Sequence, residues 1–293
     1  MVSPDLRERL RDPAYRDLHL AAVMAMRQVA DIPWYDAHFL RFYETAKLYL
    51  AAVRPDALEC FVDGFAPLRT PPGFTVQEIE GLFGAAELEA LRAEVAGLPA
   101  AKLRDDEIRT FGRHVVQDHP AFLALQRELT PRVSAWAGQE VEPGYNFLSL
   151  YGNSGRCALH MDQPISMYTL DICIDQDVEW PIWFSDVVDW PDSAAMAAFD
   201  AADVKARLPF TGYTLQPGKA ILFSGSSQWH YRDAMPRPGF CHLLFFHYYP
   251  KGCLELVESS NWPRLFDLPE LEPLIDIFRE AYPEAVGFRP VFG

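Results

Sequence analysis

The second half of the chain consists of short hydrophobic runs separated by Gly and Pro, and this pattern most restricts the folds open to it. Such runs, rich in aromatic and β-branched residues, are typical of β-strands. They lie at residues 145–151, 167–174, 181–184, 220–223 and 240–249. Several short strands separated by turns predict a sandwich or barrel, here a jelly roll.

The first half reads mainly as helix. From residue 36 to residue 54 there are few helix breakers, and apolar side chains recur at helical spacing at Phe39, Tyr43, Ala46 and Leu50. Further helical patterns run through residues 88–98 and 122–133, and Thr75 and Glu78 fit a capping box before the first of them. An Ala-rich stretch at residues 192–208 predicts a helical insertion between strands.

These patterns divide the chain of 293 residues into four regions. Residues 1–70 form an N-terminal helical region, and a proline-rich joint leads to residues 71–140, predicted as helices that brace the sheet. Residues 141–252 form the β-rich core, which contains the Ala-rich insertion, and residues 253–293 form a C-terminal extension. The fold class is therefore predicted as β-dominated α+β with a helical N-terminal region.

Composition restricts the partners. The formal net charge of −15, with no Lys/Arg-rich run, argues against nucleic acid as the main partner. The N-terminus lacks the apolar stretch of a signal peptide, and the other apolar runs are too short to span a membrane. Five cysteines are scattered without a Cys-x-x-Cys pair, which suits a reducing compartment. We therefore expect a cytoplasmic protein with no membrane partner.

One segment indicates a metal site. His160 and Asp162 stand two residues apart, and on a strand such residues point to the same face. Later in the chain, a turn at Pro217–Gly218 leads into an apolar strand, a Gly-containing loop and then His230. Two histidines and one carboxylate on one face of a metal leave the opposite positions free, the arrangement that non-haem iron(II) oxygenases use.

In this order the motifs resemble the 2-oxoglutarate/iron(II) dioxygenase superfamily, and within it the prolyl-hydroxylase-like branch. There a tyrosine strand leads into His-x-Asp, and a unit of Pro-Gly, apolar strand and histidine supplies the distal ligand. The resemblance covers roughly residues 145–249. It implies that His160, Asp162 and His230 are the catalytic iron(II) ligands and that Tyr151 lies near the cosubstrate.

The resemblance further implies a double-stranded β-helix, the cupin-like form of the jelly roll, with the ligands inside its open mouth. Fe(II), 2-oxoglutarate and O2 would act together to oxidise, most simply to hydroxylate, an unactivated C–H bond of a small molecule or peptide. The hard chemistry belongs to the iron, whereas the protein positions the substrate.

The family usually holds the distal carboxylate of 2-oxoglutarate with an Arg or Lys beyond the last histidine. The predicted strand at residues 240–249 contains neither. The candidates are Arg232, Arg237 and His242. Arg232 comes first, because it shares a strand face with His230 and its planar fork suits a carboxylate. His242 comes second, and since it is out of phase with His247, at most one of these two histidines should face the site.

Other functions stay open at this point. A cupin-like metalloenzyme could use the same ligands with zinc or manganese and without 2-oxoglutarate. A non-catalytic β-barrel binding protein could retain these residues after its metal site has lost function. Alternatively, His160 could be an ordinary core histidine beside Asp162. Because Asp162 is present, a halogenase is disfavoured. The helical N-terminal region is a candidate interface for a homodimer.

Overall fold

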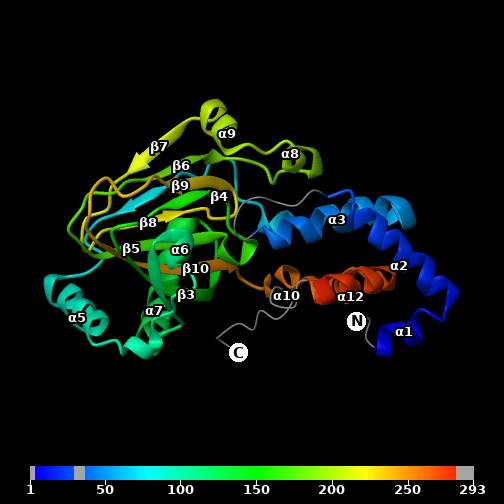
Figure 1. Cartoon of the computed structure of the whole chain (residues 1–293), viewed down its shortest axis with the longest axis horizontal. Helices are drawn as coiled ribbons and strands as arrows, with labels where there is room; N and C mark the ends of the chain where they lie inside the picture. The colour runs from blue at the N-terminus through cyan, green and yellow to red at the C-terminus, as the bar shows by residue number, and fades with distance from the viewer. Residues whose placement is uncertain (1–3, 30–36, 282–293) are drawn as a thin grey trace.

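The computed structural model describes residues 4–29 and 37–281, so residue 36 and the ends of the N- and C-terminal regions predicted above lie outside the described residues. The described chain has a β-rich part on one side and a group of helices on the other (Figure 1). None of its helices is long and apolar enough to cross a membrane.

Within the described residues, ten strands form two antiparallel sheets. The six-stranded sheet has the order β1-β8-β5-β10-β3-β2, and the four-stranded sheet has the order β4-β9-β6-β7. The strands are β1 (Gln77–Ile79), β2 (Arg113–Gln117), β3 (Val141–Tyr151), β4 (Cys157–His160), β5 (Tyr168–Gln176), β6 (Ile182–Val187), β7 (Phe210–Tyr213), β8 (Ala220–Phe223), β9 (Gln228–Arg232) and β10 (Cys241–Pro250).

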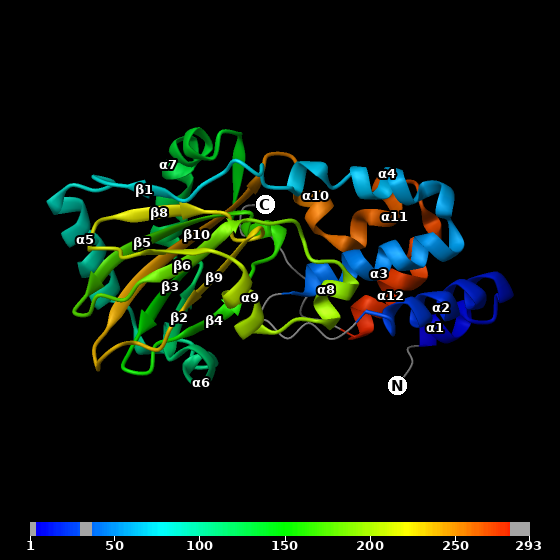
Figure 2. The same ribbon diagram turned by 90° about the horizontal axis from the view of Figure 1, so that it is seen from above.

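The helices fall into two groups. The helical lobe, so named here, combines helices from both ends of the chain, which lie side by side in both views (Figure 2). Its members are α1 (Pro4–Arg9), α2 (Pro13–Met26), α3 (His38–Val53), α4 (Leu58–Asp63), α10 (Leu254–Val257), α11 (Trp262–Leu265) and α12 (Glu272–Ala281). The remaining helices accompany the sheets: α5 (Ala85–Ala96), α6 (Ile108–Phe111), α7 (Pro120–Ala137), α8 (Ser193–Ala197) and α9 (Ala201–Arg207).

Three hydrophobic clusters hold these layers together. One joins the outer face of the six-stranded sheet to α5 and α7, through residues such as Leu148 and Phe246. A second lies between the two sheets and includes Phe184 and Phe223. The third fills the helical lobe and reaches the outer face of the four-stranded sheet at Trp229. The sheets therefore face each other across a common interior, and helices cover both outer faces.

Strand alternation decides which residues enter the space between the sheets. In β9, Trp229 packs outward in the core of the helical lobe, so its neighbour His230 points inward. In β4, Leu159 packs outward in the same way, so His160 points inward. In β10, Phe245 lies in the cluster between the sheets. Histidines on two neighbouring strands thus project into one interior.

The structure agrees with much of the predicted arrangement and corrects some of it. Each predicted strand is present, and β8 has the predicted bounds, 220–223. The two sheets face each other without closing into a barrel. Residues 71–140 are not only bracing helices, because β1 and β2 join the six-stranded sheet. The Thr75–Glu78 capping box was wrong: Glu78 lies in β1, and Glu87 accepts a hydrogen bond from the Gly84 backbone at the start of α5.

The predicted insertion at residues 192–208 consists of two short helices, α8 and α9. The described part of the C-terminal extension folds back onto the N-terminal helices. There the rings of Phe42 and Phe278 stack with centroids 4.0 Å apart, and Arg9 pairs with Asp276. The N-terminal region and the C-terminal extension therefore share one hydrophobic core.

Candidate metal centre

The candidate metal site lies where β4 and β9 pair. His160 ends β4 and is directly opposite His230 of β9, with ring centroids 4.1 Å apart. Asp162 follows two residues after β4 ends, so it does not continue the strand alternation expected from the sequence. One ligand atom from each of the three residues lies within 4.8 Å of the others. The structure thus brings the three predicted ligands together.

Backbone hydrogen bonds orient both imidazoles. The Nδ1 of His160 lies 2.9 Å from the carbonyl oxygen of Ala158, and the Nδ1 of His230 lies 2.9 Å from that of Gln228. A carbonyl only accepts, so each Nδ1 carries a proton, and in the neutral ring Nε2 keeps its lone pair. These Nε2 atoms lie 3.4 Å and 3.7 Å from Oδ1 of Asp162. Such fixed tautomers are typical of metal-binding histidines.

The protonation states suit metal binding. Burial lowers the pKa of His230 to about 4, with the neighbouring His160 acting in the same direction. Burial alone would raise the pKa of Asp162, but the histidines outweigh it and hold that pKa well below its usual range. At neutral pH the site therefore offers a neutral imidazole at His230 and an ionised carboxylate at Asp162, both forms that bind metals. Burial alone would lower the pKa of His160, but Cys157 and Asp162 outweigh it and raise that pKa, so His160 gives up a proton when a metal binds.

Asp162 is held in place by a glycine on the loop before β9. The backbone N–H of Asp162 donates a hydrogen bond to the carbonyl oxygen of this glycine, Gly225, at 2.8 Å. A Cβ at Gly225 would overlap Oδ2 of Asp162 and the carbonyl oxygen of Ser166. Only glycine leaves room for the carboxylate at this point, which gives Gly225 a role beyond that of a turn residue.

We predict that Gly225→Ala displaces the Asp162 carboxylate and weakens iron(II) binding about 10- to 100-fold, the usual effect of disturbing a residue that orients a ligand. Anaerobic titration with iron(II) measures the change. Gly152→Ala is the matched control, because a Cβ there meets nothing within 4 Å. Equal iron affinity in Gly225→Ala and wild type would contradict the prediction.

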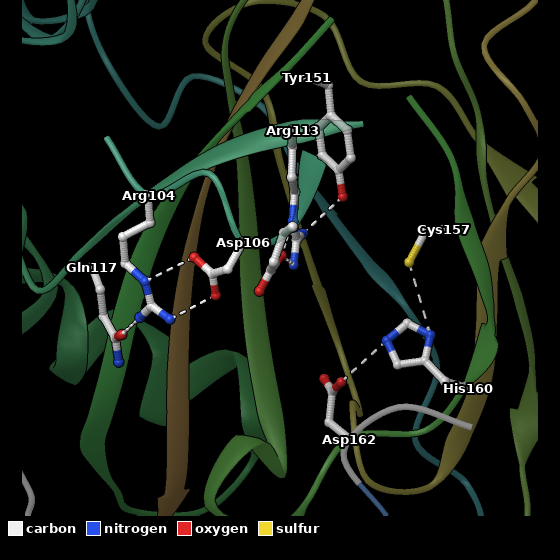
Figure 3. A network of polar contacts seen from close by, with 9 residues as sticks. Arg104, Asp106, Arg113, Gln117, Tyr151, Cys157, His160 and Asp162 are labelled. Atoms are coloured by element: carbon white, nitrogen blue, oxygen red, sulfur yellow. Dashed lines mark hydrogen bonds and ion pairs between the residues drawn. The ribbon is translucent and has the colours of Figure 1, made fainter. Parts of the chain in front are cut away.

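The three residues lie at the inner end of a pocket between the sheets. Its floor is the inner face of the six-stranded sheet, and its rim includes Arg104 and Gln117. Figure 3 shows Arg113 and Tyr151 between this rim and the His160–Asp162 pair. The residues that line the pocket on the floor include Tyr145, Phe147, Thr169, Phe245 and His247. A ligand entering past the rim therefore passes a basic residue before it reaches the metal site.

Arg232, the first predicted carboxylate anchor, lies in the pocket wall, but its charge is already paired. Its side chain is 2% exposed and contacts Asp171 at 3.0 Å, and it also donates to the carbonyl of Trp180. Burial raises the pKa of Asp171 to about 6, while Arg232 acts against that rise. A second carboxylate at Arg232 would therefore lie near a buried acidic group.

The two histidines of β10 differ in position. As expected, at most one faces the pocket, and it is His247. His242, the second predicted anchor, is absent from the pocket lining; its ring lies 4.9 Å from that of Phe240. The structure therefore does not support His242 as a cosubstrate residue.

Arg113 is a basic residue of the pocket that the sequence reasoning missed. It begins β2, directly opposite Tyr151 of β3, and its Nη1 donates to the Tyr151 hydroxyl at 2.8 Å. Its other side contacts Glu107 at 2.5 Å. Burial raises the pKa of Tyr151, so this hydroxyl keeps its proton at neutral pH. The one local signal was an arginine alternating with Val115 in a strand-like run.

The sequence matches no protein-family model and no curated protein. Solved structures that resemble the chain include HygX from Streptomyces hygroscopicus with nickel and 2-oxoglutarate bound, at 16% identity over 60% of this chain and 83% of that chain, with TM-score 0.48. EctD from S. alaskensis with bound Fe is similar at 19% identity, over 60% of this chain and 72% of that chain, with TM-score 0.43. AviO1 from Streptomyces viridochromogenes Tue57 is 14% identical over 64% of this chain and 95% of that chain, with TM-score 0.48. Because these sequence identities and TM-scores are low, the function is inferred from the residues of the site.

Proposed function

We propose that the protein is an Fe(II)- and 2-oxoglutarate-dependent oxygenase and that its facing sheets are a double-stranded β-helix. The observation that supports this proposal is the cluster of two histidines and one aspartate at the inner end of a pocket. The three residues come from the paired strands β4 and β9 and the loop after β4, and a metal held by them would keep positions open for other ligands. This donor set with open positions is typical of non-haem iron(II) oxygenases.

The residues fit the metal in a second respect. Both histidines present Nε2 toward Asp162, because backbone carbonyls hold their Nδ1 atoms. Zinc or manganese in a cupin-like enzyme would use the same donors, and that reading is retained as the alternative. The buried cation at Arg113 favours the oxygenase, because a dicarboxylic cosubstrate needs a cationic partner in the pocket.

We assign the distal carboxylate of 2-oxoglutarate to Arg113 and Tyr151. Both line the pocket, and the Tyr151 hydroxyl keeps a proton that it can donate. The Arg113 partner, Glu107, lies at the rim with 17% of its side chain exposed, so it can turn toward water when a ligand carboxylate arrives. Asp171, the partner of Arg232, is fully buried, so it cannot turn toward water in the same way.

When bound, the iron with 2-oxoglutarate and O2 would supply the oxidation of an unactivated C–H bond. The chain's own residues would orient the bound ligands and keep water away from them. Arg113 orients the cosubstrate, and the aromatic side chains of Phe147 and Phe245 exclude water beside the ligands. We further propose a small molecule or peptide as the substrate, hydroxylation as the outcome, a cytoplasmic location and a homodimer formed through the helical lobe.

The first experiment is an anaerobic titration of metal-free protein with iron(II) and then 2-oxoglutarate, followed by visible absorption. A weak charge-transfer band that needs both additions supports the oxygenase. If iron binds without a band, the cupin-like alternative is favoured, and metal analysis with zinc and manganese follows. If iron does not bind, the site is decayed and the proposal fails.

A pair of charge-neutral double variants tests the anchor. We predict that Arg113→Gln with Glu107→Gln weakens 2-oxoglutarate binding to the iron-loaded protein about 10- to 100-fold, since a charge-assisted hydrogen bond is lost. Iron affinity should stay within about twofold of wild type. The matched variant, Arg232→Gln with Asp171→Asn, removes the other ion pair of the pocket. A larger loss of 2-oxoglutarate affinity in this second variant would move the anchor to Arg232.

A further inference from the structure

His247 is a buried histidine beside the candidate metal site that the proposed function leaves without a role. It lies on β10, where the pairing with β3 shifts its register between Phe246 and Tyr248. One residue of β10 there faces two residues of β3, Gly144 and Tyr145. The extra residue lies in β3, whereas ordinary alternation in β10 places His247 on the inward face with Leu243 and Phe245.

The bulge is built with specific contacts. The side-chain amide of Gln126 donates to the carbonyl of His247 at 2.9 Å, and Asn146 donates to the Gln126 side chain at 2.8 Å. A Cβ at Gly144 would lie 3.0 Å from the carbonyl oxygen of Ile165 and 3.3 Å from that of His247. A buried polar network therefore holds the backbone of His247.

The ring has one satisfied nitrogen and one unsatisfied nitrogen. His247 is 3% exposed, and its Nδ1 lies 2.9 Å from Oγ1 of Thr169. Its face stacks on Tyr145 with centroids 4.3 Å apart. Among the described residues, its Nε2 is buried without a hydrogen-bond partner. A buried polar atom without a partner is costly, so a partner supplied by a bound ligand would remove that cost.

The unpaired nitrogen belongs to a residue that lines the pocket of the three candidate ligands. His247 lines the same pocket as the three ligands, yet it does not join their cluster. Burial lowers its pKa to about 4, so the ring is neutral at pH 7. The bond between Thr169 Oγ1 and Nδ1 fits either tautomer, and with the Thr169 hydroxyl as its donor the ring proton lies on Nε2. An N–H there suits an oxygen acceptor.

We propose that His247 is a positioning residue whose Nε2–H donates a hydrogen bond to a carboxylate oxygen of the oxo acid bound at the metal. This inference rests on the proposed function. Asp162 is not the acceptor, because its Oδ1 faces the two ligand histidines and its Oδ2 packs against Gly225. The oxo acid supplies the missing acceptor in the pocket.

The test compares His247→Phe with wild type in anaerobic titrations of iron(II) and 2-oxoglutarate. Phenylalanine keeps an aromatic ring for the stack on Tyr145 but has no N–H. We expect iron affinity within about twofold of wild type, 2-oxoglutarate affinity about 10- to 100-fold weaker, and a shifted charge-transfer band. His242→Phe on the same strand is the matched control and should leave all three values unchanged.

A second variant, His247→Gln, restores an N–H donor and should recover part of the affinity, which a purely structural role would not predict. Wild-type affinity and an unshifted band in His247→Phe would overturn the inference alone. So would a loss of iron binding equal to the loss of 2-oxoglutarate binding. A wild-type protein without any band would instead overturn the proposed function, and the inference with it.

Discussion

Asp162→Asn is expected to lower iron(II) affinity at least about 100-fold and to reduce turnover to background, since disturbing a residue that merely orients a ligand already costs about 10- to 100-fold. The variant keeps the shape of the side chain and removes the only anionic ligand of the cluster. Two neutral imidazoles then hold a divalent cation in a buried site without charge compensation. Anaerobic titration and metal analysis measure the affinity.

Asp56→Asn is the matched control for this substitution, because Asp56 lies in the helical lobe with 68% of its side chain exposed. It should bind iron as the wild type does. An Asp162→Asn protein that binds iron with wild-type affinity would show that the metal, if any, lies elsewhere. Circular dichroism of both variants checks that the fold is retained.

Arg232→Gln is expected to lower the free energy of unfolding by about 3–5 kcal/mol, the usual cost of breaking a buried ion pair by removing one partner. Asp171 is fully buried, and its Oδ1 already has no hydrogen-bond partner among the described residues. Adding Asp171→Asn should restore most of the stability, because no uncompensated charge then remains. Urea unfolding measures both variants.

The decrease in the free energy of unfolding caused by Arg232→Gln should also depend on pH. The pKa of Asp171 is raised to about 6 by burial, even with Arg232 acting against the rise, so the variant's Asp171 pKa is higher still. A carboxyl whose folded pKa exceeds its unfolded value stabilises the fold below the unfolded pKa of about 4, and this stability is lost as pH rises through the folded pKa. The variant should therefore lose less stability at acidic pH than at pH 8.

An exposed ion pair provides the comparison. Arg264 and Glu255 contact at 2.8 Å with 63% and 59% of their side chains exposed. Arg264→Gln should change stability by less than about 1 kcal/mol at any pH, because solvent screens such pairs. Equal losses in the two arginine variants, or no recovery in the Asp171 double variant, would refute the role of the buried pair.

Local patterns predicted the strands well and the ligand cluster in part. β8 was found with its exact bounds because a turn at Gly218 and an apolar run act within a few residues. The order of His160, Asp162 and His230 indicated a metal site, but the reason given for Asp162 was incomplete. Its carboxylate reaches the site from a loop, and Gly225 on a distant segment leaves the room for it.

The sequence by itself determined the strand alternation, and hence that at most one of the two histidines of β10 faces the site. Tertiary structure decided the rest. Arg113 meets Tyr151 only because β2 pairs with β3 across 38 residues. His247, rather than His242, faces the pocket because β10 turns the face that carries Leu243 and Phe245 toward the other sheet. Alternation is a local property of the backbone, whereas pairing register and bulges depend on segments far apart in the chain.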